Sequence, residues 1–244
     1  MPLAIGRDEN GRPLWLDLAA APNILLAGCT KQGKSVAMNA MIASLMLLKG
    51  QEEVKFIFID PKMAELAVWA GAAGSRYTGG ESEANAELDR LTVELDSRLS
   101  GLAGDSRRKY SKVVVFIDEY ADLMDYGSKK TAAFKNIVGL SKAGNAVGIH
   151  MVISTNRVSR GVITKEIKET FPVRMGFRMF DKRDSIVVFD RPGAERLDGN
   201  GDMLLLRGPD VERVQGTFLS TDECIAIKVK EENNIDYDSV VTPE

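Results

Sequence analysis

The chain has 244 residues and 44% hydrophobic content, enough for one sizeable α/β domain or at most two small ones. Its formal net charge of -3 argues against a protein that coats nucleic acid with its whole surface, but it does not exclude a local basic track. Two cysteines and one histidine support neither a disulfide framework nor a Cys/His zinc site, and no apolar run approaches the roughly 18 to 20 residues of a membrane span, so we expect a soluble, cytoplasmic chain.

Residues 1–20 are predicted to form a β segment, because Asn10-Gly11 between two alternating stretches is typical of a hairpin turn. Five short, nearly continuous apolar runs follow, which is typical of strands buried on both faces of a parallel sheet. They lie at residues 23–28, 54–60, 112–118, 148–155 and 173–179, and helical patterns lie between them at 35–48, 82–99 and 129–142. This order predicts an α/β domain. Residues 101–112 are expected to form an exposed loop, and residues 231–244 a flexible tail.

The stretch GCTKQGKS, residues 28–35, matches the pattern G-x-x-x-x-G-K-[ST] between an apolar strand and a helix. Such glycines let the backbone wrap closely around phosphates, Lys34 can reach the β- and γ-phosphates, and Ser35 can ligate Mg²⁺. The alternative is a chance glycine-rich turn. The predicted nucleotide-binding residues here are Gly28, Thr30, Lys31, Gln32, Gly33, Lys34, Ser35 and Val36.

Polar residues follow three further strands. Asp118 and Glu119 end the run VVVFIDEY, where Asp118 would hold Mg²⁺ and Glu119 would orient or deprotonate the attacking water; the alternative is an acidic helix cap. Asn156, after the strand at 148–155, is either a sensor of the γ-phosphate or a polar strand end. Lys62, in the stretch DPKMAEL, is read from composition as part of a strand-to-helix turn.

Several stretches in order resemble the motor domain of the FtsK/SpoIIIE family of double-stranded DNA translocases, from about residue 3 to residue 223. They include FIFIDPKMAEL, VVVFIDEYADLM, VITKEIKETFPVRMGFRM and RPGAERLDGNGDMLLL. The phosphate-binding loop alone identifies only an NTPase, whereas this combination is specific to the family. The resemblance implies a RecA-like ATPase over residues 21–230, with a mostly parallel central sheet flanked by helices. It also implies ATP and Mg²⁺ as cofactors and a homo-oligomeric ring, usually a hexamer, around duplex DNA.

The resemblance places the phosphate loop and the acidic pair on ATP and Mg²⁺, puts Asn156 at the sensor, and adds Lys62 to the nucleotide-interface region. Arg174 matches a family arginine and is the first candidate for a cation that acts across the subunit interface, so it joins Lys34, Asp118, Glu119 and Asn156 as a predicted catalytic residue. Arg178 and Arg183 are further candidates, and any of the three could equally be a solvated cation at a strand end.

This sequence departs from the family at three places. Lys31-Gln32 replaces a small pair in the loop, Asn156 and Val158 replace the more usual glutamine and proline, and Ile186 replaces an arginine. These changes concern turnover and coupling more than nucleotide binding. The membrane helices and winged-helix domain of full-length translocases have no counterpart here, so we expect an excised motor or a compact stand-alone member, with a separate membrane or DNA-targeting partner left open.

Three basic clusters are candidates for DNA contact, at residues 106–112, 127–130 and 157–168. A solvated surface is the favoured interpretation of the first two, and for Arg160 and Lys165 in the third the two interpretations are balanced. The leading hypothesis is an ATP-driven translocase of double-stranded DNA. The alternatives are a coupling or pumping ATPase of a conjugation or secretion system, and a weakly hydrolysing ATP-dependent assembly module.

Overall fold

The computed structural model describes residues 1–48, 53–124 and 131–232 of the chain. The predicted basic cluster at 127–130 and the predicted tail beyond residue 232 lie outside these ranges. The strands are β1 (Pro2–Asp8), β2 (Pro13–Asp17), β3 (Asn23–Ala27), β4 (Val54–Asp60), β5 (Ser75–Gly79), β6 (Lys112–Ile117), β7 (Ile149–Thr155), β8 (Val173–Phe177), β9 (Asp202–Arg207) and β10 (Asp210–Gly216). The helices are α1 (Lys34–Leu48), α2 (Glu81–Gly104), α3 (Ala132–Ala143), α4 (Lys165–Thr170), α5 (Lys182–Phe189) and α6 (Thr221–Glu232), with 3₁₀-helices η1 (Ala67–Trp69), η2 (Tyr120–Leu123), η3 (Gly144–Val147) and η4 (Ala194–Arg196).

All ten strands form one sheet in the order β2-β1-β10-β9-β8-β3-β7-β6-β4-β5. The six strands from β8 to β5 pair in parallel, and the four at the other edge pair antiparallel. The predicted α/β class with a mostly parallel sheet is confirmed, and all five predicted apolar runs are strands of its parallel part. Strand β7 lies between β3 and β6, so the strand that precedes the phosphate loop and the strand that precedes the acidic pair share one neighbour.

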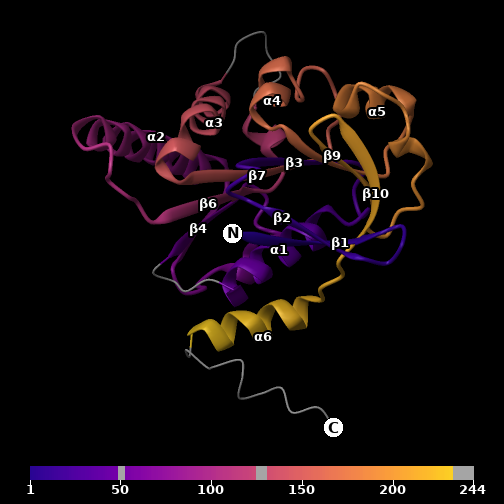
Figure 1. Cartoon of the computed structure of the whole chain (residues 1–244), viewed down its shortest axis with the longest axis horizontal. Coiled ribbons are helices and arrows are strands. Elements are labelled where there is room, and N and C mark those ends of the chain that lie inside the picture. Colours follow the sequence, from indigo (N-terminus) through magenta and orange to yellow (C-terminus); the bar gives the residue numbers. More distant parts are fainter. Residues whose placement is uncertain (49–52, 125–130, 233–244) are drawn as a thin grey trace.

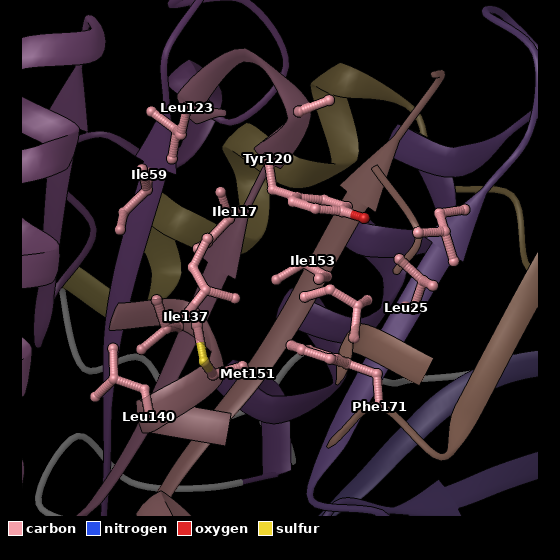
Figure 2. Packing of buried hydrophobic residues seen from close by; sticks show 14 of the residues in the cluster. Leu25, Ile59, Ile117, Tyr120, Leu123, Ile137, Leu140, Met151, Ile153 and Phe171 are labelled. Atoms are coloured by element: carbon pink, nitrogen blue, oxygen red, sulfur yellow. The ribbon is translucent and has the colours of Figure 1, made fainter. Parts of the chain in front are cut away.

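Side chains of the parallel strands alternate between two buried clusters, one on each face of the sheet. In β6, Val113, Val115 and Ile117 belong to the cluster shared with α2 and α3, whereas Val114 and Phe116 belong to the cluster shared with α1. Figure 1 shows α2, α3, α4 and α5 on one side of the sheet and α1 and α6 on the other. Figure 2 shows the first cluster filling the space between strands and helices. This burial on both faces explains the continuous apolar runs.

The predicted N-terminal hairpin is confirmed, since β1 and β2 pair antiparallel around the turn at residues 9–12. Strand β1 also pairs with β10, which makes the hairpin the edge of the central sheet. The expected loop at 101–112 is wrong in its first four residues, because α2 continues to Gly104. Among the described residues, no helix is both long enough and apolar enough to cross a membrane.

Candidate nucleotide-hydrolysis site

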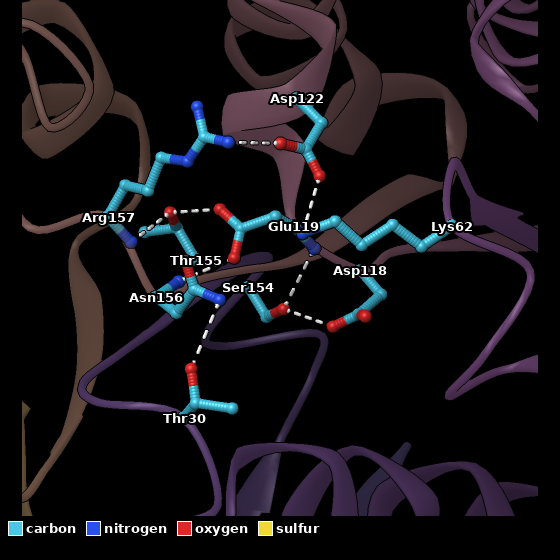
Figure 3. Close-up of polar contacts among 9 residues, drawn as sticks. All are labelled: Thr30, Lys62, Asp118, Glu119, Asp122, Ser154, Thr155, Asn156 and Arg157. Carbon is cyan, nitrogen blue, oxygen red and sulfur yellow. Dashed lines mark hydrogen bonds and ion pairs between the residues drawn. The ribbon is translucent and has the colours of Figure 1, made fainter.

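The predicted site residues converge where parallel strands end. The phosphate loop follows β3, Lys62 follows β4, the acidic pair follows β6 and Asn156 follows β7. Because these four strands run in the same direction, their carboxyl ends meet at one edge of the sheet, which is where open α/β sheets bind ligands. Figure 3 shows the polar side chains from these strand ends pointing toward one another.

The phosphate loop is held largely by main-chain contacts. Gly28 and Gly33 have φ of 147° and 112°, which side chains with a Cβ rarely adopt. A Cβ on Gly33 would lie 2.8 Å from the Cα of Gly201, whose amide donates to the carbonyl of Gln32 at 3.0 Å. The turn 199–201, part of the stretch DGNGDM, therefore supports the loop from behind, which gives that stretch a structural role.

Lys34 lies inside the loop that it ends, with only 8% of its surface exposed. Its ammonium donates to the carbonyls of Gly28 and Cys29, each at 2.8 Å. Burial lowers the pKa of Lys34, while the charges of Glu119 and Asp118 oppose that shift. The ammonium of Lys34 is thus close enough to the acidic pair to interact with it electrostatically.

A cavity of about 340 Å³ opens beside the loop and the first turn of α1. Lys31, Gly33, Lys34, Ser35 and Val36 line one side of it, as the sequence predicts for nucleotide-binding residues. Its other side comes from the ends of β9 and β10, and includes Asn200, Gln215, Thr217 and Phe218. Sequence reasoning did not single out these four, although Asn200 lies within the family-like stretch RPGAERLDGNGDMLLL.

Asp118 accepts a hydrogen bond on Oδ1 from the hydroxyl of Ser154, at 2.6 Å. Burial raises the pKa of Asp118 to about 6. The carboxylates of Asp60, Glu65 and Glu119 add to the rise, and the bond from Ser154 opposes it. Asp118 therefore lies among three other carboxylates and near the ammonium of Lys34.

Glu119 sits in a left-handed backbone conformation, with φ 46° and ψ 59°, and is 4% exposed. Its Oε1 accepts from the hydroxyl of Thr155 at 2.6 Å, and its Oε2 accepts from the amide of Asn156 at 2.7 Å. Glu119 occupies the N-cap position of η2, but its side chain makes no capping bond there, so its carboxylate does not serve as a cap. Strand β7 instead holds both acidic residues, a role of Ser154 and Thr155 that the sequence did not reveal.

Asn156 joins the acidic pair to the phosphate loop. While its main-chain amide binds Glu119, its side-chain amide donates to the hydroxyl of Thr30 at 3.4 Å. Next to it, Asp122 pairs with Arg157 at 3.0 Å and with Lys62 at 2.9 Å, and the hydrogen bond that Lys62 donates to Asp122 raises the pKa of Lys62. The structure therefore places Lys62 and Asn156 in the same polar group as Glu119 (Figure 3).

Arg174 is not part of this group. It lies within β8, its guanidinium donates to the carbonyl of Val188 and pairs with Asp190 at 3.7 Å, and burial lowers its pKa. Arg178 and Arg183 are exposed, and the carbonyl of Arg178 accepts from the amide of Cys29 in the loop. Which arginine acts across a subunit interface stays a prediction.

The residues present suit Mg²⁺. The hydroxyl of Ser35 and the carboxylate of Asp118 are hard oxygen ligands, and the neighbouring carboxylates of Asp60, Glu65 and Glu119 favour a cation. Within residues 1–48, 53–124 and 131–232, no group of three His, Cys, Asp or Glu side chains is arranged to hold a metal. Mg²⁺ does not need such a cage, because it is usually bound through one or two carboxylates, waters and phosphates.

Residues 1–98 match the model of the FtsK/SpoIIIE family. The DNA translocase FtsK of Haemophilus influenzae is 34% identical, over 93% of this chain and 50% of the relative, and that of Pseudomonas syringae pv. tomato is 36% identical, over 91% and 32%. The chain belongs to the FtsK/SpoIIIE family. It spans half or less of the length of these curated relatives.

Solved structures of other P-loop ATPases share the FtsK/SpoIIIE fold seen here. The pCW3 conjugation coupling protein TcpA, in its monomer form with ATPγS, is 23% identical with a TM-score of 0.84 over 96% of this chain and 70% of that one. The cytoplasmic domain of the type VII secretion ATPase EccC of Thermomonospora curvata is 21% identical with a TM-score of 0.80, over 92% and 30%. These likenesses confirm the RecA-like ATPase fold.

Proposed function

We propose that the chain hydrolyses ATP and uses the energy to move double-stranded DNA, as the motor domain of a homo-oligomeric ring. The observation that carries this proposal is the meeting of the phosphate loop with the acidic pair, joined by Asn156 between Thr30 and Glu119. Family membership supports the choice of DNA, since the curated relatives are named DNA translocases. Those relatives extend well beyond the matched region, so their whole activity is a hypothesis for this chain.

Each group has a chemical part in this hydrolysis. The loop amides and Lys34 bind the phosphates. To do so, the ammonium of Lys34 gives up its hydrogen bonds to the carbonyls of Gly28 and Cys29 and donates to phosphate oxygens instead. Ser35 and Asp118 would hold Mg²⁺, which would supply positive charge to offset that of the phosphates. Glu119 orients the attacking water and accepts its proton.

Contact with DNA is assigned to the basic cluster at 157–168, because it begins at the site. Arg157 pairs with Asp122, and the buried hydroxyl of Tyr120 donates to the carbonyl of Val162 at 2.8 Å. The residues after the acidic pair are thereby bonded to the start of the basic cluster, where Arg160 and Lys165 are exposed. The cluster at 106–112 instead leads into the amino end of β6, whereas the site lies at the carboxyl ends of the parallel strands.

The test is steady-state phosphate release with and without long linear duplex DNA, over a salt series. We expect strong stimulation that salt weakens, because phosphate contacts release counterions. Lys34→Ala should abolish release, while Lys135→Ala, at an exposed lysine on α3, should not. Joint Arg160→Ala and Lys165→Ala changes should weaken stimulation and flatten its salt dependence.

Other outcomes distinguish the alternatives. A rate of ATP hydrolysis that DNA does not change at low salt would contradict the translocase. It would favour a coupling or pumping ATPase that is stimulated by another cargo. ATP-dependent oligomerisation with little phosphate release would favour the assembly module. Analytical ultracentrifugation with and without ATP tests the ring directly, because a chain that stays monomeric with ATP and DNA would contradict it.

A further inference from the structure

Thr155, the last residue of β7, has a hydroxyl whose direction is fixed. It is fully buried, its oxygen accepts from the amide of Arg157 at 3.0 Å, and its proton goes to Oε1 of Glu119 at 2.6 Å. A hydroxyl has a single proton, so the amide of Arg157 occupies a lone pair and leaves that proton for Glu119. Burial keeps competing water away, and the branched side chain has few alternative rotamers.

Glu119 depends on such external anchors. A non-glycine residue in the left-handed region is strained, and persists there only when its surroundings hold it. Its own amide donates to the hydroxyl of Ser154 at 3.1 Å, and Oε2 accepts from the main chain of Asn156. Thr155 differs from these two, since it bonds the carboxylate through a side chain that a substitution can remove without changing the backbone.

We propose that Thr155 is a positioning residue, which aims the carboxylate of Glu119 at the water that attacks ATP. This inference rests on the proposed hydrolysis of ATP. Each carboxylate oxygen has about two lone-pair sites, and one site on each is used, by the hydroxyl of Thr155 and by the amide of Asn156. The remaining sites are free to accept from water, so the anchors orient the carboxylate and leave its basic function intact.

The first experiment compares Thr155→Val, which removes the hydroxyl at nearly constant volume, with Thr155→Ser, which keeps it. Thr155→Val should lower kcat for ATP by about 10- to 100-fold, as loss of a supporting hydrogen bond at a reaction centre typically does, with KM changed by less than about threefold. Thr155→Ser should retain most of the rate. The matched control is Thr170→Val at the end of α4, a buried threonine whose hydroxyl bonds main-chain carbonyls away from the acidic pair.

The second experiment asks whether Thr155 acts through Glu119. In a Glu119→Gln background, single-turnover rates should be nearly the same with and without Thr155→Val, because residues that act as a unit are not additive. Binding of a fluorescent ATP analogue by every variant shows that the site is still folded.

The outcomes separate this inference from the proposed function. A wild-type chain without ATP turnover would overturn both. Wild-type turnover that Thr155→Val leaves unchanged or increases would overturn the positioning role alone, and an increase would mean that Thr155 holds Glu119 away from the water. An effect of Thr155→Val that is just as large in the Glu119→Gln background would also overturn it.

Discussion

The phosphate loop and the acidic pair lie side by side in the site, yet they are held in different ways. The loop is fixed mainly by glycine geometry and by a main-chain bond to the turn 199–201. The acidic pair is fixed by the hydroxyls of Ser154 and Thr155 in β7 and by the amide of Asn156, which follows β7. A binding surface built from backbone changes little when side chains around it change, whereas carboxylates aimed by hydroxyls can be tuned one bond at a time. Substitutions in the two regions should therefore separate binding from turnover.

The largest expected effect is that of Gly33→Ala. The new Cβ would meet the Cα of Gly201 at 2.8 Å, in a backbone conformation with φ of 112° that alanine rarely adopts. The Cα of Gly201 belongs to the main chain and not to a flexible side chain, so the phosphate loop must move away from the turn 199–201. We expect ATP affinity to fall by more than about 100-fold, equivalent to roughly 3 kcal/mol, in a titration with a fluorescent ATP analogue.

Gly139→Ala is the control for this change. Gly139 lies in α3, where an added Cβ has no neighbour within 4 Å. Alanine there should raise the free energy of unfolding by roughly 0.5–1 kcal/mol and leave ATP binding unchanged. Equal losses of ATP binding in both variants would contradict a loop held by its backbone.

A smaller effect is expected where the two regions meet, at Asn156. Asn156→Ala removes the bond to Thr30 but keeps the main-chain amide that binds Glu119. We expect kcat for ATP to fall by about 10-fold with little change in KM, in phosphate-release assays. A change in KM alone would place the side chain with the phosphate loop and would contradict its part in turnover.

A further effect concerns the fold and not the site. His150 in β7 is 1% exposed, and burial, followed by the charge of Lys112, lowers its pKa from 6.5 to about 4. The native state therefore disfavours the charged form of His150. The contribution of this group to the free energy of unfolding is fully present above about pH 6.5 and is lost as the pH falls toward 4. In urea unfolding, we expect this group to cost about 2 kcal/mol between about pH 7 and pH 5, and His150→Phe to remove that cost. An unchanged pH dependence in His150→Phe would contradict this account.

The parallel part of the sheet was readable from the sequence because its strands are buried on both faces. Runs such as VKFIFID are typical of strands covered on both faces, and strand β4 has the predicted bounds. Strands β9 and β10 escaped prediction. The pattern of β10, which lies between β1 and β9, mixes exposed and buried residues, whereas β9 is mostly buried. Strand β5 also carries little apolar signal, since none of its residues is fully buried.

The candidate site was predictable where a motif fixes the chemistry. The glycine-lysine loop and the acidic pair can be recognised from the spacing of their residues in the sequence, and the structure brings them together. The supporting contacts are not legible in this way, because they depend on which strand lies between β3 and β6. Only the order of the strands shows that Ser154 and Thr155 face the acidic pair, and that the turn 199–201 lies behind the loop.

The most direct test of the account is Glu119→Gln, measured for ATP binding and phosphate release on the same preparation. If the loop binds ATP and Glu119 serves as the base, the variant should bind the fluorescent ATP analogue as tightly as the wild type while its kcat falls by about 10²- to 10⁴-fold. Turnover close to the wild-type rate would contradict the assignment of Glu119, and with it the division of the site into a binding loop and a hydrolytic pair.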